Sequence, residues 1–311
     1  MLNETIGNLF FNGEPAYPDS STNEVGIECE MEFRGQDRDY PPPCTGWRYT
    51  RDGSLRGRAY EAVLVNPKPR NQVRSVLTTL KNAIEEAGET HKPSNRTSTH
   101  VHLNVCNQTV TCVYNIICLY IIFEESLFDY CGKDRKGNLF CLGLNDSNGY
   151  TDLIVNCLAN YTRNSSELSS YYDGVSSPLT EPAQSALRYS AFNLNALAKF
   201  GSIEFRQMRC PLNDNNELDI DTIETWVRLL LAIKDAAIKY KNPIEIIADF
   251  SNKGPIDFAN HVFKGLTTTI LPDIVFAEQL LYDAMYTAQD IAYACDWPTA
   301  KEEASRSTVP F

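Results

Sequence analysis

Residues 26–33 of the sequence, GIECEMEF, alternate strictly between apolar and acidic side chains. A period of two is typical of a β-strand that has one face in a hydrophobic core. The opposite face would then carry Glu28, Glu30 and Glu32 in one row. Carboxylates spaced about 7 Å apart repel each other by about 2 kcal/mol per pair at an effective dielectric constant of about 20. A bound divalent cation would remove this repulsion.

Three further predicted strands carry chemically active side chains on one face. These side chains are Glu61 in the strand at 59–65, His100 and His102 in the strand at 98–105, and Glu204 and Arg206 in the strand at 201–208. A site made of carboxylates and a histidine favours Mg²⁺ or Mn²⁺, and these ions commonly bridge the phosphates of a bound nucleotide. An arginine adds a planar fork of donors for phosphate oxygens. Together the strands predict a metal–phosphate site on one sheet face.

Each motif also has a simpler interpretation. The three glutamates could form a solvated strand face, and the two histidines could be an exposed or hydrogen-bonded pair. Glu204 and Arg206 could form an ion pair on the same face. The joint occurrence of these residues on four predicted strands favours the metal–phosphate site over independent surface patterns.

The elements that would position these residues follow from the hydrophobic pattern. A turn at Asp52-Gly53 joins a strand at 47–50 to the one at 59–65, and an amphipathic helix at 70–87 ends at Gly88. The remaining predictions are an arm at 1–24, an apolar helix at about 109–130, loops at 35–46, 132–150 and 160–182, and helices from about 217, including 244–250, 256–264 and 273–294. Strands mixed with helices, followed by helices alone, indicate an α+β fold with a mainly antiparallel sheet.

We expect one catalytic domain over residues 1–311, with the sheet-containing core at 24–210 and a helical part at 217–297 packed on it. The net charge of −12 and the pI of about 4.9 argue against a general nucleic-acid binder. The apolar run at 110–123 is too short to span a bilayer, and the N-terminus lacks the features of a secretory signal. Ten cysteines without a C-x-x-C pair suit buried, reduced thiols. The expectation is a soluble cytoplasmic protein.

Several motifs occur in an order that resembles the amidoligase family. They are GIECE (26–30), WRYTRDGSL…YEAVLV (47–65), THVHLNV (99–105), a helix with Glu124 near its end, RYSAFNLNAL (188–197) and SIEFR (202–206). This family belongs to the carboxylate–amine ligases of the glutamine synthetase and glutamate–cysteine ligase superfamily. The resemblance covers roughly residues 24–235.

The resemblance implies a curved, mainly antiparallel sheet backed by helices, whose concave face forms an active-site bowl. The bowl would bind ATP and two or three Mg²⁺ or Mn²⁺ ions. In such ligases ATP phosphorylates a substrate carboxylate, and an amine then attacks the acyl phosphate to give an amide. Relatives are often encoded by phages, and they are thought to act on amino acids, peptides or cell-wall fragments.

The resemblance also implies roles for individual residues. The implied metal ligands are Glu28, Glu30, Glu61, Glu204 and one of the two histidines His100 and His102. Arg206 would clamp phosphate oxygens, and Asp52 matches the acidic residue of the Asp-Gly-Ser turn. The amine must lose a proton, and Asp52 or a carboxylate from another loop could accept it. Arg188, Tyr189 and Asn193 would contact the nucleotide or the substrate.

Some assignments stay open at the level of sequence. Arg135 is a weaker phosphate candidate, and a solvated loop cation is the favoured interpretation for it. Glu32 lies outside the family pattern and is expected either to support the ligands or to face solvent. The alternatives to a ligase are a metal-dependent phosphatase or hydrolase and a non-catalytic nucleotide- or ligand-binding relative. The expected partners are a small-molecule or peptide carboxylate and an amine, with homo-oligomers left open.

Overall fold

A computed structural model describes residues 2–14, 24–35, 43–138, 141–145, 148–167, 178–180, 182–184 and 189–297. The strands are β1 (Val25–Glu32), β2 (Trp47–Thr50), β3 (Ala59–Leu64), β4 (Thr99–Asn104), β5 (Phe192–Asn193) and β6 (Ser202–Phe205). They form one sheet in the order β2-β3-β1-β4-β6-β5, and all neighbouring strands are antiparallel. The predicted α+β class, with an antiparallel sheet backed by helices, is confirmed.

Helices lie between the strands in the chain and also follow the last strand. The α-helices are α1 (Ile6–Phe11), α2 (Val73–Glu86), α3 (Val110–Cys131), α4 (Asn148–Glu167), α5 (Asn195–Phe200), α6 (Ile220–Ala237), α7 (Pro243–Lys253), α8 (Pro255–Phe263), α9 (Thr267–Ile270) and α10 (Ile274–Ala292). Short 3₁₀ turns cover Arg70–Gln72, Lys133–Arg135, Pro182–Gln184 and Lys264–Leu266. The predicted helices at 244–250, 256–264 and 273–294 are therefore confirmed.

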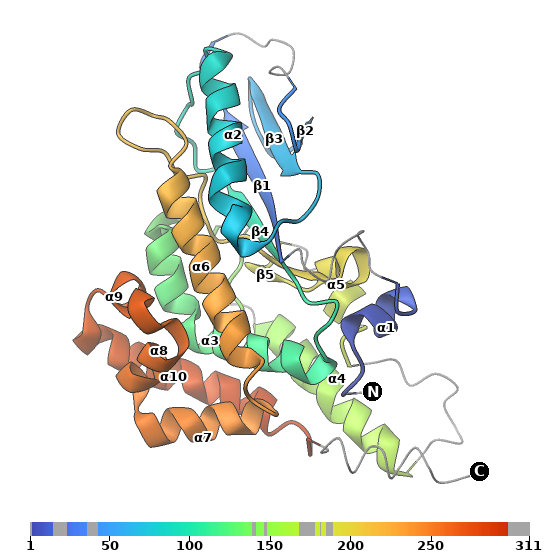
Figure 1. Cartoon of the computed structure of the whole chain (residues 1–311). Coiled ribbons are helices and arrows are strands. Elements are labelled where there is room, and N and C mark those ends of the chain that lie inside the picture. The colour runs from blue at the N-terminus through green and yellow to red at the C-terminus, as the bar shows by residue number, and fades with distance from the viewer. Residues whose placement is uncertain are drawn as a thin grey trace.

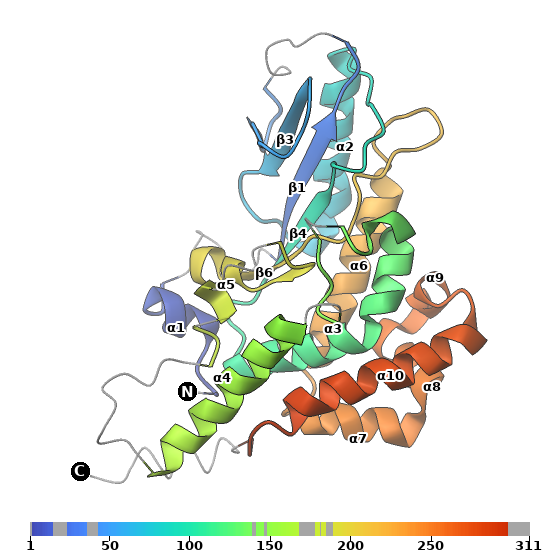
Figure 2. The ribbon, with the colours of Figure 1, turned by 180° about the vertical axis from the view of Figure 1, so that it is seen from behind.

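The two faces of the sheet differ in what covers them. Helix α2 lies in front of β1 and β3, with α6 beside it (Figure 1). From behind, β1 and β3 lie in front of α2, and none of the described helices is drawn over them (Figure 2). The apolar residues of β1 are buried in the same core as Leu77 and Leu80 of α2. Alternate residues of a strand point to opposite sides, so the glutamates of β1 point to the face that no described helix covers.

Helix α3 is the central helix of the core. By length and composition it could cross a membrane, but 94% of its apolar window is buried inside the protein. Asn115 lies in this window, and its Nδ2 donates to the carbonyl oxygens of Ala237 (3.1 Å) and Tyr240 (2.8 Å). The buried amide thus satisfies carbonyl groups at the end of α6. These contacts are consistent with a core helix of a soluble protein.

Glu124, near the end of α3, is also buried. Its carboxylate accepts hydrogen bonds from the backbone N–H groups of Leu144 (2.6 Å) and Asn145 (2.7 Å). Burial raises the pKa of Glu124 to about 7, although these two donors favour the ionised form. Glu124 therefore fixes the segment at 141–145 to the core helix.

The structure contains two helices that were not predicted from the sequence, and the second of them replaces parts of predicted loops. Helix α1 lies within the predicted arm, and Thr5 caps it by accepting a hydrogen bond from the N–H of Asn8 (3.2 Å). Helix α4 covers parts of both predicted loops, 132–150 and 160–182. Tyr150, Ile154 and Leu158 of α4 are buried and lie four residues apart, which is a helical spacing. The many Asn, Ser and Gly residues around them concealed this pattern.

Candidate metal site and its flanking cavities

The strand register gathers the predicted ligands on the sheet face that no described helix covers. Glu28 lies opposite His100, Glu30 opposite Glu61, and His102 opposite Glu204. Strand β6 ends at Phe205, but the N–H of Arg206 still donates to the carbonyl of Ala191 (2.9 Å). The guanidinium of Arg206 reaches Glu204 on the same face, so the ion pair of the simpler interpretation is present. The alternation seen in the sequence thus becomes one cluster.

Two groups within this cluster could hold a metal ion. The first contains Glu28, Glu61 and His100, and the second contains Glu28, His102 and Glu204. In each group the ligand atoms lie within 4.8 Å of one another. Glu28 belongs to both groups. Carboxylate oxygens and imidazole nitrogens are both common ligands of divalent metal ions.

The contacts of His100 indicate which of its two nitrogens faces the carboxylates of the metal groups. The Ser98 hydroxyl donates its one proton to Glu30, so it accepts from His100 Nε2, which lies 2.7 Å away. A neutral His100 then has its lone pair on Nδ1. Nδ1 lies 3.1 Å from a carboxylate oxygen of Glu28 and 3.4 Å from one of Glu204. The Arg206 guanidinium, whose Nη1 lies 3.5 Å from Nδ1, already places one positive charge beside these carboxylates, and a metal ion bound at Nδ1 would place a second one there.

His102 has a similar arrangement at the other group. Its Nδ1 lies 3.1 Å from the Ser202 hydroxyl, and its Nε2 lies 3.4 Å from a carboxylate oxygen of Glu28. Nε2 is buried and has no hydrogen-bond partner among the described residues. A buried polar atom without a partner is costly unless a ligand satisfies it. The geometry therefore places one histidine in each candidate metal group.

Neighbouring charges control the protonation of the carboxylates. Burial alone would raise the pKa of Glu28, but the positive charge of His102 and the close approach of both imidazole rings hold this pKa well below its usual value. Burial would also raise the pKa of Glu204, but the positive charge of the Arg206 guanidinium outweighs it and lowers this pKa. At Glu61, burial and the charge of Glu28 raise the pKa to about 7, although Thr50 donates a hydrogen bond of 2.7 Å to this carboxylate. Metal binding at Glu61 must therefore displace a proton near neutral pH.

We expect the affinity for Mn²⁺ to fall about tenfold for each pH unit below about 7 and to level off above about pH 8. The raised pKa of Glu61 stabilises the metal-free fold below the carboxyl's ordinary pKa of 4.5, and this contribution is lost as the pH rises through about 7. Mn²⁺ needs the ionised carboxylate, so its binding follows the opposite trend. Calorimetric titrations in two buffers of different ionisation enthalpy would measure the released proton. A Mn²⁺ affinity that stays constant below pH 8 would contradict the assignment of Glu61 as a metal ligand. An equally steep dependence of this affinity on pH in Glu61→Gln would contradict it as well.

The other two glutamates of β1 lie outside both metal groups. Glu30 accepts from Ser98, and its carboxylate lies 3.9 Å from His100 Nε2. Glu32 is 2% exposed, accepts from the N–H of Arg56 at 2.9 Å and lies 3.7 Å from the ammonium of Lys92. The solvent-facing option for Glu32 is therefore wrong, and its carboxylate contacts Arg56 and Lys92 instead of a candidate metal ligand.

Three further residues were predicted to contact the nucleotide, its phosphates or the substrate, namely Asn193, Arg188 and Arg135. Asn193 Nδ2 donates to Glu204 at 2.7 Å, so it orients a metal-group carboxylate. Arg188 lies outside the described residues. The favoured interpretation of Arg135 as a solvated cation is wrong, because it is 2% exposed. It donates to the carbonyls of Gln207 and Arg206, both at 3.0 Å. These bonds fix the backbone that presents Arg206.

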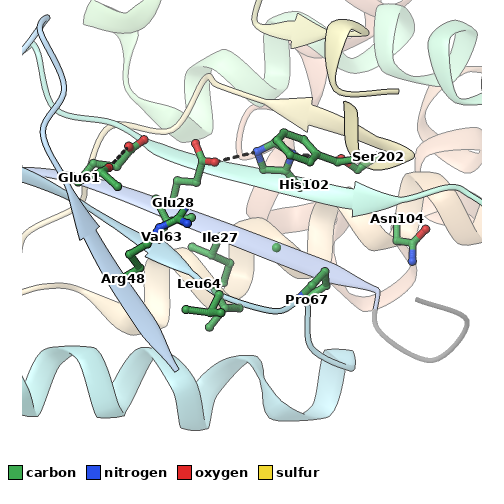
Figure 3. A pocket seen from close by; sticks show the side chains of 14 residues that line it. Ile27, Glu28, Arg48, Glu61, Val63, Leu64, Pro67, His102, Asn104 and Ser202 are labelled. Carbon is green, nitrogen blue, oxygen red and sulfur yellow. Dashed lines mark hydrogen bonds and ion pairs between the residues drawn. The ribbon is translucent and has the colours of Figure 1, made fainter. Parts of the chain in front are cut away.

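Two cavities open beside the metal groups. The first, of about 210 Å³, is lined by Glu28, Glu61 and His102 together with Arg48 and apolar side chains. Figure 3 shows Glu28 pointing toward His102, with Val63, Leu64 and Pro67 nearby. The apolar lining residues are Ile27, Val63, Leu64, Val65, Pro67 and Phe200. This cavity combines ligand oxygens with an apolar wall.

The second cavity has a volume of about 370 Å³ and is polar and cationic. Its lining residues are Glu30, Asp52, Gly53, Ser54, Arg56, Arg96, Ser98, Arg135, Tyr189 and Arg206. Asp52 accepts a hydrogen bond from the N–H of Ser54 (2.6 Å), which fixes the predicted turn. Along β1 the first cavity touches residues 26–28 and the second touches Glu30, so they lie at successive positions of the strand.

Several residues that support the site were missed from the sequence. Thr50, Ser98 and Ser202 each contact a candidate ligand. Ser98 and Ser202 lie two residues before His100 and Glu204, so the period-two pattern would have placed them on the same face. Small hydroxyl residues attract little notice in sequence, although such partners orient histidine ligands.

Comparison with known proteins leaves the geometry as the basis for assigning a function. Neither a scan against protein-family models nor a search of curated proteins finds a match for this chain. What the chain can do is therefore indicated by its clustered ligands, its two cavities and the order of its sequence motifs.

Proposed function

We propose that this chain is an ATP-dependent carboxylate–amine ligase of the amidoligase kind, which forms an amide or peptide-like bond through an acyl phosphate. One observation carries the proposal. A carboxylate–histidine cluster lies on one sheet face, between a partly apolar cavity and an arginine-lined cavity. A nucleotide and an acid would thus approach the same ligands from two positions. We further propose that the sheet is curved like the glutamine synthetase catalytic domain.

The two cavities suit the two substrates. The apolar side chains of the first cavity, including Val63 and Phe200, offer a surface for the adenine base. The phosphates would then extend toward Glu28, Glu61 and His102, which would hold Mg²⁺ or Mn²⁺. When bound, these ions neutralise phosphate charge and orient the transferring group. The acid would occupy the second cavity, where Arg206 lies.

The chain itself supplies positioning and charge. A carboxylate oxygen of the acid attacks the γ-phosphorus, and ADP leaves. The amine then attacks the acyl carbon, inorganic phosphate leaves, and the amine loses a proton. Arg206 would donate to the phosphoryl oxygens in both steps, since phosphoryl transfer depends mainly on alignment and charge stabilisation. Asp52 lines the acid cavity and is the proposed proton acceptor.

A trapping assay tests this function. Incubation with ATP, Mg²⁺, a panel of carboxylic acids and hydroxylamine is expected to give ADP, phosphate and a hydroxamate, because hydroxylamine captures the acyl phosphate. Each acid needs a control without ATP and a control without acid. Phosphate release without hydroxamate for every acid would favour the phosphatase or hydrolase alternative. Absence of nucleotide binding in the presence of Mg²⁺ or Mn²⁺ would contradict both enzyme assignments.

A further inference from the structure

Helix α10 has one face that packs on the protein and another that faces solvent. The buried residues of α10, which include Leu281, Ala288 and Ile291, belong to the hydrophobic core. In Figures 1 and 2, α10 lies beside α7 and α8, at the end of the molecule away from β1 and β3. In the view from behind, α10 lies in front of these two helices (Figure 2). Its exposed residues therefore form part of the molecular surface on this side, far from the metal groups.

Aromatic side chains are concentrated on this exposed face. Among the described residues, seven large apolar or aromatic side chains are exposed, and four of them lie on α10 or directly after it: Phe276, Tyr282, Tyr286 and Tyr293. The three tyrosines are four and seven residues apart, so they follow one line along a helix of 3.6 residues per turn. Tyr286 and Tyr293 are 62% and 61% exposed, and the ring of Tyr282 packs edge-on against Phe250 of α7 at 5.6 Å. A single exposed tyrosine is ordinary, whereas this aligned set, the tyrosine stripe, has the composition of a protein interface.

The charges around the tyrosine stripe are all negative. The sequence has no lysine, arginine or histidine from 265 to 300, and the exposed acidic residues of this region are Asp273, Glu278, Asp283, Asp290 and Asp296. None of these five forms an ion pair with a described residue. The helical spacing puts Glu278 on one side of the stripe, and Asp283 and Asp290 on the other. A second copy of this face would bring like charges together, so the face is complementary to a cationic partner.

We propose that the tyrosine stripe binds a basic helical segment of another protein. Arginine or lysine side chains of that segment would lie over the tyrosine rings and beside the flanking carboxylates, because a cation is attracted to both an aromatic face and a carboxylate. Tyr282 and Tyr293 are separated by about 16 Å along the helix axis, which is the length of about three turns of a partner helix. This surface lies away from the metal groups, so the inference holds whether or not the chain is a ligase.

A labelled synthetic helix tests the proposal with the full-length protein. The probe carries leucines along one face with arginines on both sides, and its counterpart carries glutamates in place of the arginines. Fluorescence anisotropy is expected to show that the arginine peptide binds about tenfold or more tightly than the glutamate peptide. Tyr286→Ser/Tyr293→Ser should weaken the binding of the arginine peptide about tenfold or more, because it removes two exposed rings without changing the net charge. Absence of binding by the arginine peptide, or an unchanged affinity in the tyrosine variant, would overturn the proposal.

Two charge-matched variants separate this face from the overall acidity of the chain. Asp283→Asn/Asp290→Asn should weaken the binding of the arginine peptide about fivefold or more, since it removes the carboxylates beside the stripe. Glu86→Gln/Asp214→Asn removes the same charge from exposed positions at the end of α2 and between β6 and α6, and its affinity should stay within about twofold. Equal losses in these two variants would indicate non-specific attraction and overturn the proposal. Sedimentation of the protein alone would reveal self-association, and a dimer that dissociates in the tyrosine variant would assign the stripe to a second copy instead.

Discussion

Replacement of Glu28 by glutamine is expected to lower ATP-dependent hydroxamate formation by roughly 10³-fold. Glu28 is the residue shared by both candidate metal groups, so its loss weakens both at once. The substituted amide would present a neutral oxygen where two ions need a charged one. The rate of ADP release and the Mn²⁺ affinity from electron paramagnetic resonance would measure the effect. Circular dichroism would show whether the fold is retained.

Glu32→Gln is the matched control for this experiment. Glu32 lies on the same strand and the same face, but it contacts Arg56 and Lys92 and belongs to neither metal group. Its substitution should leave Mn²⁺ affinity within about twofold, because no metal-group contact is removed. Equal losses of Mn²⁺ binding in the two variants, or full activity in Glu28→Gln, would show that the ligands are wrongly assigned.

Glu124→Ala should reduce the free energy of unfolding by about 3 kcal/mol. The substitution leaves the N–H groups of Leu144 and Asn145 without their acceptor and opens a space in the core beside α3. Unfolding in urea, followed by circular dichroism, would measure the change, with the slope of the transition compared between variants.

Glu125→Ala provides the neighbouring control. Glu125 accepts a hydrogen bond from the exposed Lys136 at 2.5 Å, and such surface ion pairs contribute less than about 1 kcal/mol. A loss in Glu124→Ala as small as that in Glu125→Ala would mean that Glu124 does not fix the segment at 141–145.

The ligand cluster was predictable because strand periodicity is a local property. Glu28 and Glu30, or His100 and His102, must share a face once their segments form strands. The hydrophobic alternation also indicated which face is buried. Strand order and register depend on contacts between distant segments. Sequence periodicity alone could therefore not show that Glu28, rather than Glu30, would be shared by the two groups.

Other features depend on long-range packing. Arg135 lies in a segment with loop composition, yet it is buried because its guanidinium meets carbonyl groups about 70 residues away. Helix α4 was obscured by polar residues around its three buried positions. The second cavity joins residues from β1, the β2–β3 turn and segments near 96, 135, 189 and 206, and no local pattern could have assembled it.

The shared position of Glu28 has a consequence for how the two groups would fill. One carboxylate that serves two cations has less negative charge to offer the second once the first is bound. The two binding events would therefore be thermodynamically linked, and the link would be antagonistic: occupancy of either group would lower the affinity of the other. A titration would proceed in two steps, so the chain would respond in a graded way to the free concentration of divalent cations.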